Sequence, residues 1–357
     1  MTGTFWAILP PVIAIVLALI TKEVYLSLMI GIASGALMYH NFHLIKAMDT
    51  IFAIMGEKIG ANCDILIFLV LLGILVALIT KSGASRAYGK WAAKAIRTKR
   101  QALFATICLG VVIFVDDYFN CLTVGSVMRP VTDKHQVSRA KLSYIIDATA
   151  APVCIIAPIS SWAAAVAGFV EGEDGFSIFI RAIPYNYYAL FTIIFMIVLI
   201  VRKIDYGPMR THEKNALKGD IYTTPDRPYA NAENEVVETK GKVIDLVFPM
   251  IVLITACVIG MIYSGGFFSG VGFVEAFSGS DASVGLMYGS FFALVITIIY
   301  YMFRRVLKFS ESMSCIPEGF KAMVPAILIL TFAWTLKAMT DSLGAKEFVA
   351  ELVKSTP

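Results

Sequence analysis

Charged residues are scarce in this sequence, and their scarcity excludes a water-soluble protein. Asp, Glu, Lys and Arg make up only 16% of the 357 residues, whereas 58% are hydrophobic, and the mean hydropathy is +0.76. Several apolar runs approach the roughly 20 residues that a membrane-spanning helix needs. The composition therefore predicts an all-α, multi-pass membrane protein that contacts lipid, and we expect it in the cytoplasmic membrane.

Motifs that would indicate an enzyme or a metal centre are also lacking. The six cysteines are scattered, mostly inside apolar runs, and none stands in CxxC or Cys/His spacing. No HExxH or GxSxG pattern occurs. An intramembrane hydrolase built on Asp116 and Asp117 is a weak alternative, because adjacent acids on one helix cannot face each other across a substrate. We expect free thiols, no cofactor, no nucleic-acid partner and no enzyme activity; a non-transporting membrane subunit is a further alternative.

What the sequence does contain is a series of apolar runs, at about 5–21, 24–40, 62–80, 101–119, 141–168, 178–201, 243–265, 283–303 and 322–340. Basic residues gather between 81 and 100 and between 129 and 141, and loops of this kind face the cytoplasm. Both ends of segment 101–128 would then lie on one side of the membrane. The segment is therefore predicted to be a re-entrant hairpin, with its turn near Asp116–Thr123.

Polar segments divide the chain. Residues 84–97 carry basic residues at helical spacing beside Tyr88 and Trp91, which predicts an amphipathic helix on the cytoplasmic face. Residues 203–242 form a long hydrophilic segment, which we interpret as a cytoplasmic linker. The expected parts are the scaffold spans of a first repeat (1–83), its transport elements (84–202), the linker (203–242), and the scaffold spans and surface helix of a second repeat (243–357).

Two short patterns support this internal repeat. Leu28–Gly31 recurs as Leu286–Gly289, and Leu78–Ala84 is echoed by Ala338–Ala345, each about 260 residues later. The order of the spans is kept, as is a short surface helix, at 346–354 in the second copy. Because the first copy starts outside and the second starts from the cytoplasmic linker, the copies would have opposite orientations, as in the inverted repeats of secondary transporters.

Polar side chains at the hairpin turn are the first candidates for ion binding. Asp116, Asp117 and Asn120 lie within about one helical turn, and ionisable groups at membrane depth are functional candidates by default. Carboxylate and amide oxygens suit alkali cations, so these residues predict a site for Na⁺ and H⁺. The alternatives are a solvated acid pair and a turn-forming Asn. Thr123 and Ser126 are packing residues or contacts for an ion or substrate.

Segment 141–168 is predicted to be a broken helix, because Pro152 and Pro158 interrupt its hydrogen bonding. Asp147 lies in this apolar run, where desolvation favours a proton-exchanging carboxyl; an ion pair with a cytoplasmic base is the alternative. Three hydroxyl side chains beside the prolines would supply neutral oxygen ligands, and for the serines the alternative is small-residue helix packing. They are Thr149, Ser160 and Ser161.

These motifs resemble the NhaC-type sodium/proton antiporter family over essentially the whole chain. The resemblance is carried by Val115–Asn120, Asp147–Val153, Pro158–Trp162, Asp205–Met209, Leu9–Pro11 and Lys22–Val24. It implies the fold of the larger ion transporter superfamily, with a scaffold domain and a transport domain of two re-entrant hairpins and two broken helices. It also implies exchange of cytoplasmic Na⁺ for external H⁺ by an elevator-like alternating-access movement.

One departure from the family bears on the site. The resemblance implies a second hairpin and a second broken helix after the second surface helix, whereas the sequence ends at Pro357. We therefore expect an incomplete second repeat, either through truncation or because another polypeptide, or a second copy in a homodimer, completes it. The alternative function is Na⁺- or H⁺-coupled transport of a small organic acid or amino acid, with neutral donors from Asn120, Thr123, Ser160 and Ser161.

Overall fold

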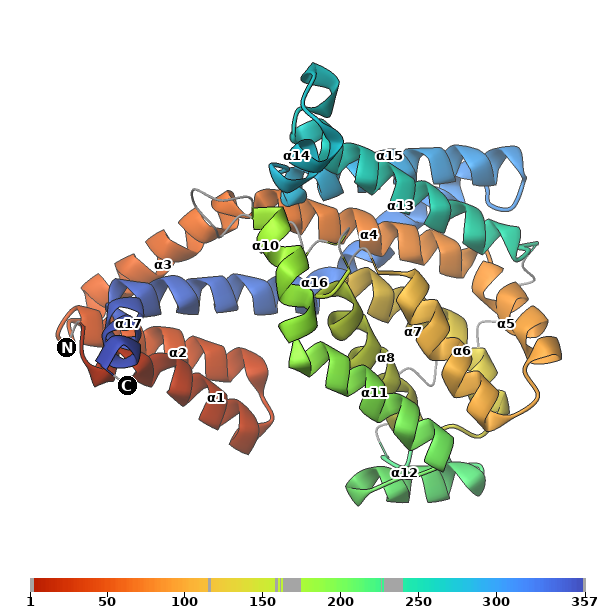
Figure 1. The fold of residues 1–357 in the computed structure, drawn as a ribbon, viewed down its shortest axis with the longest axis horizontal. Coiled ribbons are helices and arrows are strands. Elements are labelled where there is room, and N and C mark those ends of the chain that lie inside the picture. The colour runs from red at the N-terminus through yellow and green to blue at the C-terminus, as the bar shows by residue number, and fades with distance from the viewer. Residues whose placement is uncertain are drawn as a thin grey trace. The chain divides into compact units, whose positions relative to one another are not determined.

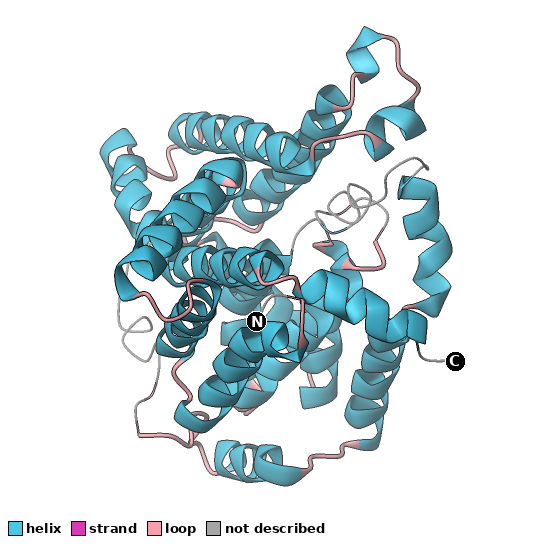
Figure 2. Cartoon of the chain, turned by 90° about the vertical axis from the view of Figure 1, so that its left-hand side faces the viewer, coloured by secondary structure: helices cyan, strands magenta, loops and turns pink. Residues whose placement is uncertain are grey.

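The computed structural model describes residues 3–114, 117–157, 160, 162, 175–225, 227 and 240–355, and in these ranges it contains helices and no strand (Figures 1 and 2). The all-α class is confirmed. The chain divides into two compact units, of which unit 1 comprises residues 1–69 and 321–357 and unit 2 comprises residues 70–320. The boundaries between them fall within α4 (Cys63–Lys81) and α16 (Phe309–Ser342).

Unit 1 is built from apolar helices that approach one another through glycines. Besides parts of α4 and α16, its elements are η1 (Phe5–Ile8), α1 (Leu9–Thr21), α2 (Val24–Tyr39), α3 (Leu44–Ala61) and α17 (Ala345–Ser355). A Cβ at Gly31 on α2 would lie 2.8 Å from the Cβ of Ala14 on α1, and a Cβ at Gly35 would lie 2.9 Å from Met339 Cγ. These contacts therefore require residues without a side chain.

Unit 2 holds the other helices, which are α5 (Ala84–Ala95), α6 (Lys99–Val112), α7 (Asp117–Lys134), α8 (Arg139–Cys154), α10 (Gly175–Ala182), η2 (Ile183–Tyr185), α11 (Tyr187–Arg202), α12 (Gly207–Leu217), α13 (Ile244–Ser264), η4 (Phe267–Ser269), α14 (Phe273–Ser278) and α15 (Ala282–Phe303). Helices α6, α7 and α8 contact one another, and α11 packs against α6 and α8. The apolar core of this group includes Leu103, Ile145 and Met196. Three segments from separate parts of the sequence thus surround α8.

Glycine positions in α1–α2 and α13–α15 match the repeat that the sequence predicts. Gly289 on α15 faces α13, where its Cβ would lie 2.4 Å from Cys257 Cα. Gly31 holds the same place in its own pair, on the second helix and facing the first. The recurring Leu-Met-x-Gly pattern therefore marks the same kind of close helix contact in both pairs.

The two expected surface helices also begin alike. Gly83 precedes α5 with φ of 75°, and Gly344 precedes α17 with φ of 76°. Left-handed backbone of this kind favours glycine, because other residues carry a Cβ that crowds the chain. Both helices agree closely with the ranges expected from the sequence, 84–97 and 346–354.

Several helices are long and apolar enough to cross a membrane. Among the described residues they are Cys63–Lys81, Ile244–Ser264, Ser283–Phe303 and Phe309–Ser342. A pair bent by 47°, Ile178–Tyr185 with Tyr187–Arg202, would form a fifth span, and Phe5–Thr21 and Val24–Tyr39 are shorter apolar helices. The multi-pass membrane class is therefore confirmed, while the inverted orientation of the repeats stays a prediction.

The structure differs from the expected runs at several points. Helix α3 has no counterpart among them, because charges such as Asp49 and Lys58 interrupt its apolar face. The run 322–340 is the second half of the longer α16, and segment 203–242 contains α12. In segment 141–168, helix α8 ends at Cys154, two residues after Pro152.

Candidate functional site

The break between α6 and α7 lies just before the turn that the sequence predicts near Asp116–Thr123, because residues 117–123 already belong to α7. Helix α6 ends at Val112, α7 begins at Asp117, and the two helices contact each other. The Asn120 side chain closes the break, since its Nδ2 donates hydrogen bonds to the carbonyls of Gly110 (2.7 Å) and Ile113 (2.8 Å). Carbonyls in the last turn of a helix lack intrahelical donors, so Asn120 supplies the donors that α6 needs.

The same geometry leaves one oxygen of Asn120 without a partner. Because both of its partners are carbonyls, the amide nitrogen must face them and Oδ1 must face the other way. The side chain is completely buried, and Oδ1 has no hydrogen-bond partner in the described part of the chain. An unpaired buried acceptor is costly, which is why such atoms often mark ligand or ion sites.

Further polar groups continue along α7 at the spacing of one helical turn. Asp117 stands three residues before Asn120, in the first turn of α7, and Thr123 stands three residues after it. Thr123 is buried, and its Oγ1 also lacks a partner within the ranges described above. The hydroxyl of Ser126, by contrast, donates to the Thr123 carbonyl at 3.0 Å. Asp116 lies outside the described residues.

Helix α8 forms the other wall of this cluster through Thr149. A Cβ at Gly110 would lie 2.8 Å from Thr149 Cγ2 and 3.4 Å from Asn120 Oδ1, so α6, α7 and α8 converge at this glycine. Thr149 is buried, and its hydroxyl donates to the carbonyl of Ile145 at 2.6 Å. Thr149 thus lies beside the Asn120 oxygen while its own proton is already used within α8.

Ser160 contacts the end of α8. Its buried hydroxyl lies 2.6 Å from the carbonyl oxygen of Cys154 and 3.0 Å from that of Ala157. Carbonyls at a helix C-terminus need such donors. Ser161 lies outside the described residues, so its expected role stays a prediction.

We call the break between α6 and α7, with Asn120, Thr123 and the facing Thr149, the α6–α7 junction. Asp147 does not face this junction. It is exposed on α8, and two residues of helix turn its side chain about 200° away from that of Thr149, which faces Gly110. Asp147 instead lines a groove with α11 side chains, among them Tyr188 and Phe191. The structure therefore brings Asn120 and Thr149 together at Gly110, places Asp117 and Thr123 about one turn before and after Asn120 on α7, and leaves Asp147 on another face of α8.

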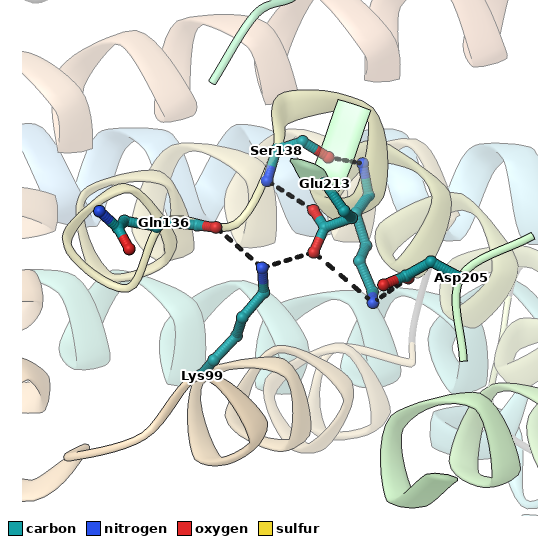
Figure 3. Close-up of polar contacts among 6 residues, drawn as sticks. Lys99, Gln136, Ser138, Asp205 and Glu213 are labelled. Atoms are coloured by element: carbon teal, nitrogen blue, oxygen red, sulfur yellow. Dashed lines mark hydrogen bonds and ion pairs between the residues drawn. The ribbon is translucent and has the colours of Figure 1, made fainter. Parts of the chain in front are cut away.

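A buried ion-pair cluster, which the sequence reasoning missed, ties α12 to the ends of α6 and α8 (Figure 3). Glu213 on α12 accepts a hydrogen bond from the Ser138 backbone N–H at 2.8 Å and pairs with Lys99 at 2.5 Å and Lys141 at 3.7 Å. Lys141 also pairs with Asp205 at 2.5 Å. Helix α12 and Asp205 are therefore held here by ion pairs with Lys99 and Lys141.

The charge state of Glu213 follows from these contacts. Burial alone would raise the pKa of this carboxyl, but the hydrogen bonds from Lys99 and Ser138 and the charge of Lys99 lower the pKa below its ordinary value. Glu213 is consequently ionised at neutral pH. The only sequence signal was one acid on a short helix within a polar segment.

A second paired cluster stands at the beginning of α13. Asp245 is fully buried and accepts hydrogen bonds from Arg304 at 3.2 and 3.3 Å and from the Tyr300 hydroxyl at 3.0 Å. The Tyr301 hydroxyl donates to the Asp245 carbonyl at 2.6 Å. Both carboxylate oxygens are engaged, so this cluster holds α13 to α15.

No group of three or more His, Cys, Asp or Glu side chains among the described residues could hold a metal ion. The junction offers carboxylate, amide and hydroxyl oxygens instead, which are ligands for a hard alkali cation. Together with the span-length helices, this arrangement defines a polytopic membrane protein with a polar break inside a helical hairpin.

Comparisons with known proteins identify its family. The sequence model of the Na⁺/H⁺ antiporter family matches residues 166–356, which is more than half of the chain. An uncharacterized protein of Haemophilus influenzae is 35% identical over 379 aligned residues, which cover 99% of this chain and 70% of that protein. No solved structure matches. The chain belongs to the Na⁺/H⁺ antiporter family.

Family membership settles several expectations. The protein is a membrane transporter and not an enzyme, and its family indicates cation-coupled antiport with Na⁺ and H⁺ as the transported ions. The match begins at residue 166, after the junction residues, so the family assignment rests on other parts of the chain. The roles of Asp117, Asn120 and Thr123 therefore depend on their geometry alone.

Proposed function

We propose that this protein exchanges Na⁺ for H⁺ across the cytoplasmic membrane and that Na⁺ binds at the α6–α7 junction. The observation that carries the proposal is the buried, unpartnered Oδ1 of Asn120, which faces away from the two carbonyls that its amide nitrogen holds. A bound cation would supply the missing partner. Thr123 Oγ1, one turn further along α7, offers a second neutral oxygen in the same state.

The carboxylates supply charge balance and the proton. Asp117 stands one turn before Asn120 on α7, and Asp116 adjoins it in the sequence. A carboxylate that faces Na⁺ is ionised, and the same group takes a proton once the ion has left. Since one site cannot hold both, competition between Na⁺ and H⁺ couples their movements in opposite directions.

Alternating access would require the junction to face each side of the membrane in turn. The matched glycine contacts of α1–α2 and α13–α15, and the matched starts of α5 and α17, support an internal repeat. Repeats of opposite orientation allow two halves of a carrier to exchange conformations around a fixed site. We propose an elevator-like movement of the elements that carry the junction, including α6, α7 and α8.

The proposal is tested by Na⁺-dependent proton movement in proteoliposomes that contain the purified protein. Asp117→Asn should reduce exchange at least tenfold, because it removes a charge and leaves the hydrogen bonds of Asn120 in place. Asn120→Ala should also reduce exchange at least tenfold, because it removes Oδ1 together with the two hydrogen bonds that close the break. Asp49→Asn, which alters an exposed acid on α3, is the matched control and should keep exchange. Full exchange by both junction variants would place the Na⁺ site elsewhere.

The same assay distinguishes Na⁺/H⁺ antiport from the alternative function, which is coupled transport of an organic solute. Na⁺, Li⁺ and K⁺ are each added alone and then with a panel of small organic acids and amino acids. Proton movement with Na⁺ alone supports antiport. A requirement for an organic solute would favour a coupled carrier of that solute.

A further inference from the structure

Asp147 faces a groove that the Na⁺/H⁺ exchange proposed above does not use. The groove has a volume of about 620 Å³ and lies between α8 and α11, two helices of unit 2 that contact each other. Its lining includes Tyr144, Asp147, Tyr188, Phe191, Thr192 and Phe195. The α11 residues follow at intervals of three and four, so their side chains lie along one face of that helix.

The groove lies about two helical turns from the basic residues at the start of α8 and the end of α11. Asp147 stands eight residues from Arg139 at the start of α8, or roughly 12 Å along the axis, and Phe195 stands seven residues from Arg202 at the end of α11, or roughly 10 Å. If both arginines lie at the cytoplasmic interface, the carboxylate approaches the middle of a hydrocarbon core about 30 Å thick.

Among the described residues, none forms a hydrogen bond or ion pair with the carboxylate of Asp147. The nearest base on its own helix, Lys141, is engaged by Asp205 and Glu213. The remaining groove residues carry no positive charge. Acids at such depth are costly unless they face a cavity or a partner of opposite charge, so the groove is complementary to a cation.

The walls of the groove determine which cation fits. Tyr188 and Phe191 are each 64% exposed and Phe195 is 45% exposed, so their rings are open to a ligand. Aromatic faces attract organic ammonium ions, which are weakly hydrated and have apolar substituents. Na⁺ instead needs several oxygen ligands at once, and around Asp147 the groove offers only scattered hydroxyls. An organic acid would be repelled by the carboxylate.

We propose that the groove between α8 and α11 binds a small organic ammonium ion, with Asp147 as its counter-ion and the rings of Tyr188, Phe191 and Phe195 against its apolar groups. Membrane acyl chains can cover the rings but cannot neutralise the acid. The ammonium site is separate from the α6–α7 junction, because Asp147 and Thr149 point to different faces of α8.

Choline is a suitable probe, and its uncharged isostere 3,3-dimethyl-1-butanol is the matched control ligand. Binding is measured by calorimetry on the purified full chain in nanodiscs made from lipids without choline headgroups. Choline should bind at least tenfold more tightly than the isostere. Asp147→Asn should weaken choline binding at least tenfold, Asp147→Glu should retain most of it, and Phe195→Leu, which keeps apolar volume but removes the ring, should weaken it severalfold.

Equal binding of choline and the isostere, or unchanged choline binding by Asp147→Asn, would overturn the proposal, as would failure of choline to bind. Because binding is measured without an ion gradient, it is independent of exchange. Choline binding without Na⁺/H⁺ exchange would contradict only the proposed function. Exchange without choline binding would contradict only the ammonium site. Asp117→Asn should leave choline binding intact, since it alters the junction and not the groove.

Discussion

Two polar clusters in unit 2 differ in how completely their groups are paired. Around Glu213, two lysines and a second acid are joined by ion pairs, which include Glu213 Oε2, and a backbone N–H donates to Oε1, across α6, α8 and α12. At the α6–α7 junction, the amide nitrogen of Asn120 is fully used, whereas its oxygen and the hydroxyl oxygen of Thr123 are buried without partners among the described residues.

The difference in pairing indicates different roles: the Glu213 cluster holds α12 in place, and the junction is suited to binding an ion. A closed set of opposite charges gains nothing from an added ion, so the Glu213 cluster can hold α12 in place but has no room for a substrate charge. Buried oxygens without donors would gain from a cation, and the junction presents two of them one helical turn apart. Substitutions in the first cluster should therefore alter stability, and those in the second should alter Na⁺ affinity.

The largest expected effect belongs to the paired cluster. Glu213→Gln leaves Lys99 and Lys141 without their shared acid, and breaking a buried pair in this way costs about 3 kcal/mol. Na⁺ affinity should stay unchanged in the folded fraction. Chemical unfolding in detergent measures the loss, with Glu57→Gln as the control, because its pair with Lys58 is exposed and worth less than about 1 kcal/mol.

Acid should open the same cluster in a defined pH range. The folded-state pKa of Glu213 is lowered below its unfolded value, so its stabilising contribution is complete above the unfolded pKa of about 4.3 and is lost as the pH falls through the lower folded pKa. We expect proteolysis between α11 and α12 to appear only in that acidic range. In Glu213→Gln it should already occur at pH 7; cleavage of the unaltered protein at pH 6 would contradict the ionised state.

The sequence predicts the elements whose cause is local. Basic residues at helical spacing predict α5, and acids, an amide and a hydroxyl stand at the start of α7, just after the break. These elements can be predicted from the sequence because each depends on residues that are neighbours in the chain. The same reasoning places the end of α8 near Pro152, where the helix stops at Cys154.

What escaped prediction depends on distant residues. Glu213 looks like a solvated acid in a polar segment, and its burial follows only from docking against Ser138, 75 residues earlier. Likewise, nothing in the local pattern tells that Thr149 faces Gly110 while Asp147 faces α11. Helical spacing predicts that the two differ in direction, but the packing of α6 and α11 around α8 decides what each one meets.

Alanine substitutions at Gly110 and Gly56 should differ in their effect on stability, because only Gly110 is packed against neighbouring side chains at the junction. Gly110→Ala introduces a Cβ 2.8 Å from Thr149 Cγ2, and such overpacking costs about 1–3 kcal/mol, against a gain in helix propensity of about 1 kcal/mol. Gly56→Ala on α3 meets nothing within 4 Å and should only gain. Thr149→Ser removes the clashing methyl, so the double variant should recover both stability and Na⁺ affinity.

The smallest expected change in stability comes from substituting two buried threonines of α7. The same pair distinguishes most clearly an effect on stability from an effect on Na⁺ affinity. The hydroxyl of Thr132 is bonded within its own helix, 3.0 Å from the carbonyls of Met128 and Arg129, whereas that of Thr123 has no described partner. Thr132→Val should therefore cost about 1 kcal/mol and leave the Na⁺ dependence of exchange unchanged. Thr123→Val removes an unpaired buried hydroxyl, so it should be neutral or stabilising, yet it should raise the Na⁺ concentration for half-maximal exchange severalfold. Paired unfolding and exchange measurements check both. If Thr123→Val destabilises the protein as Thr132→Val does and leaves Na⁺ affinity intact, its hydroxyl is a packing group and the junction loses one of its two neutral ligands.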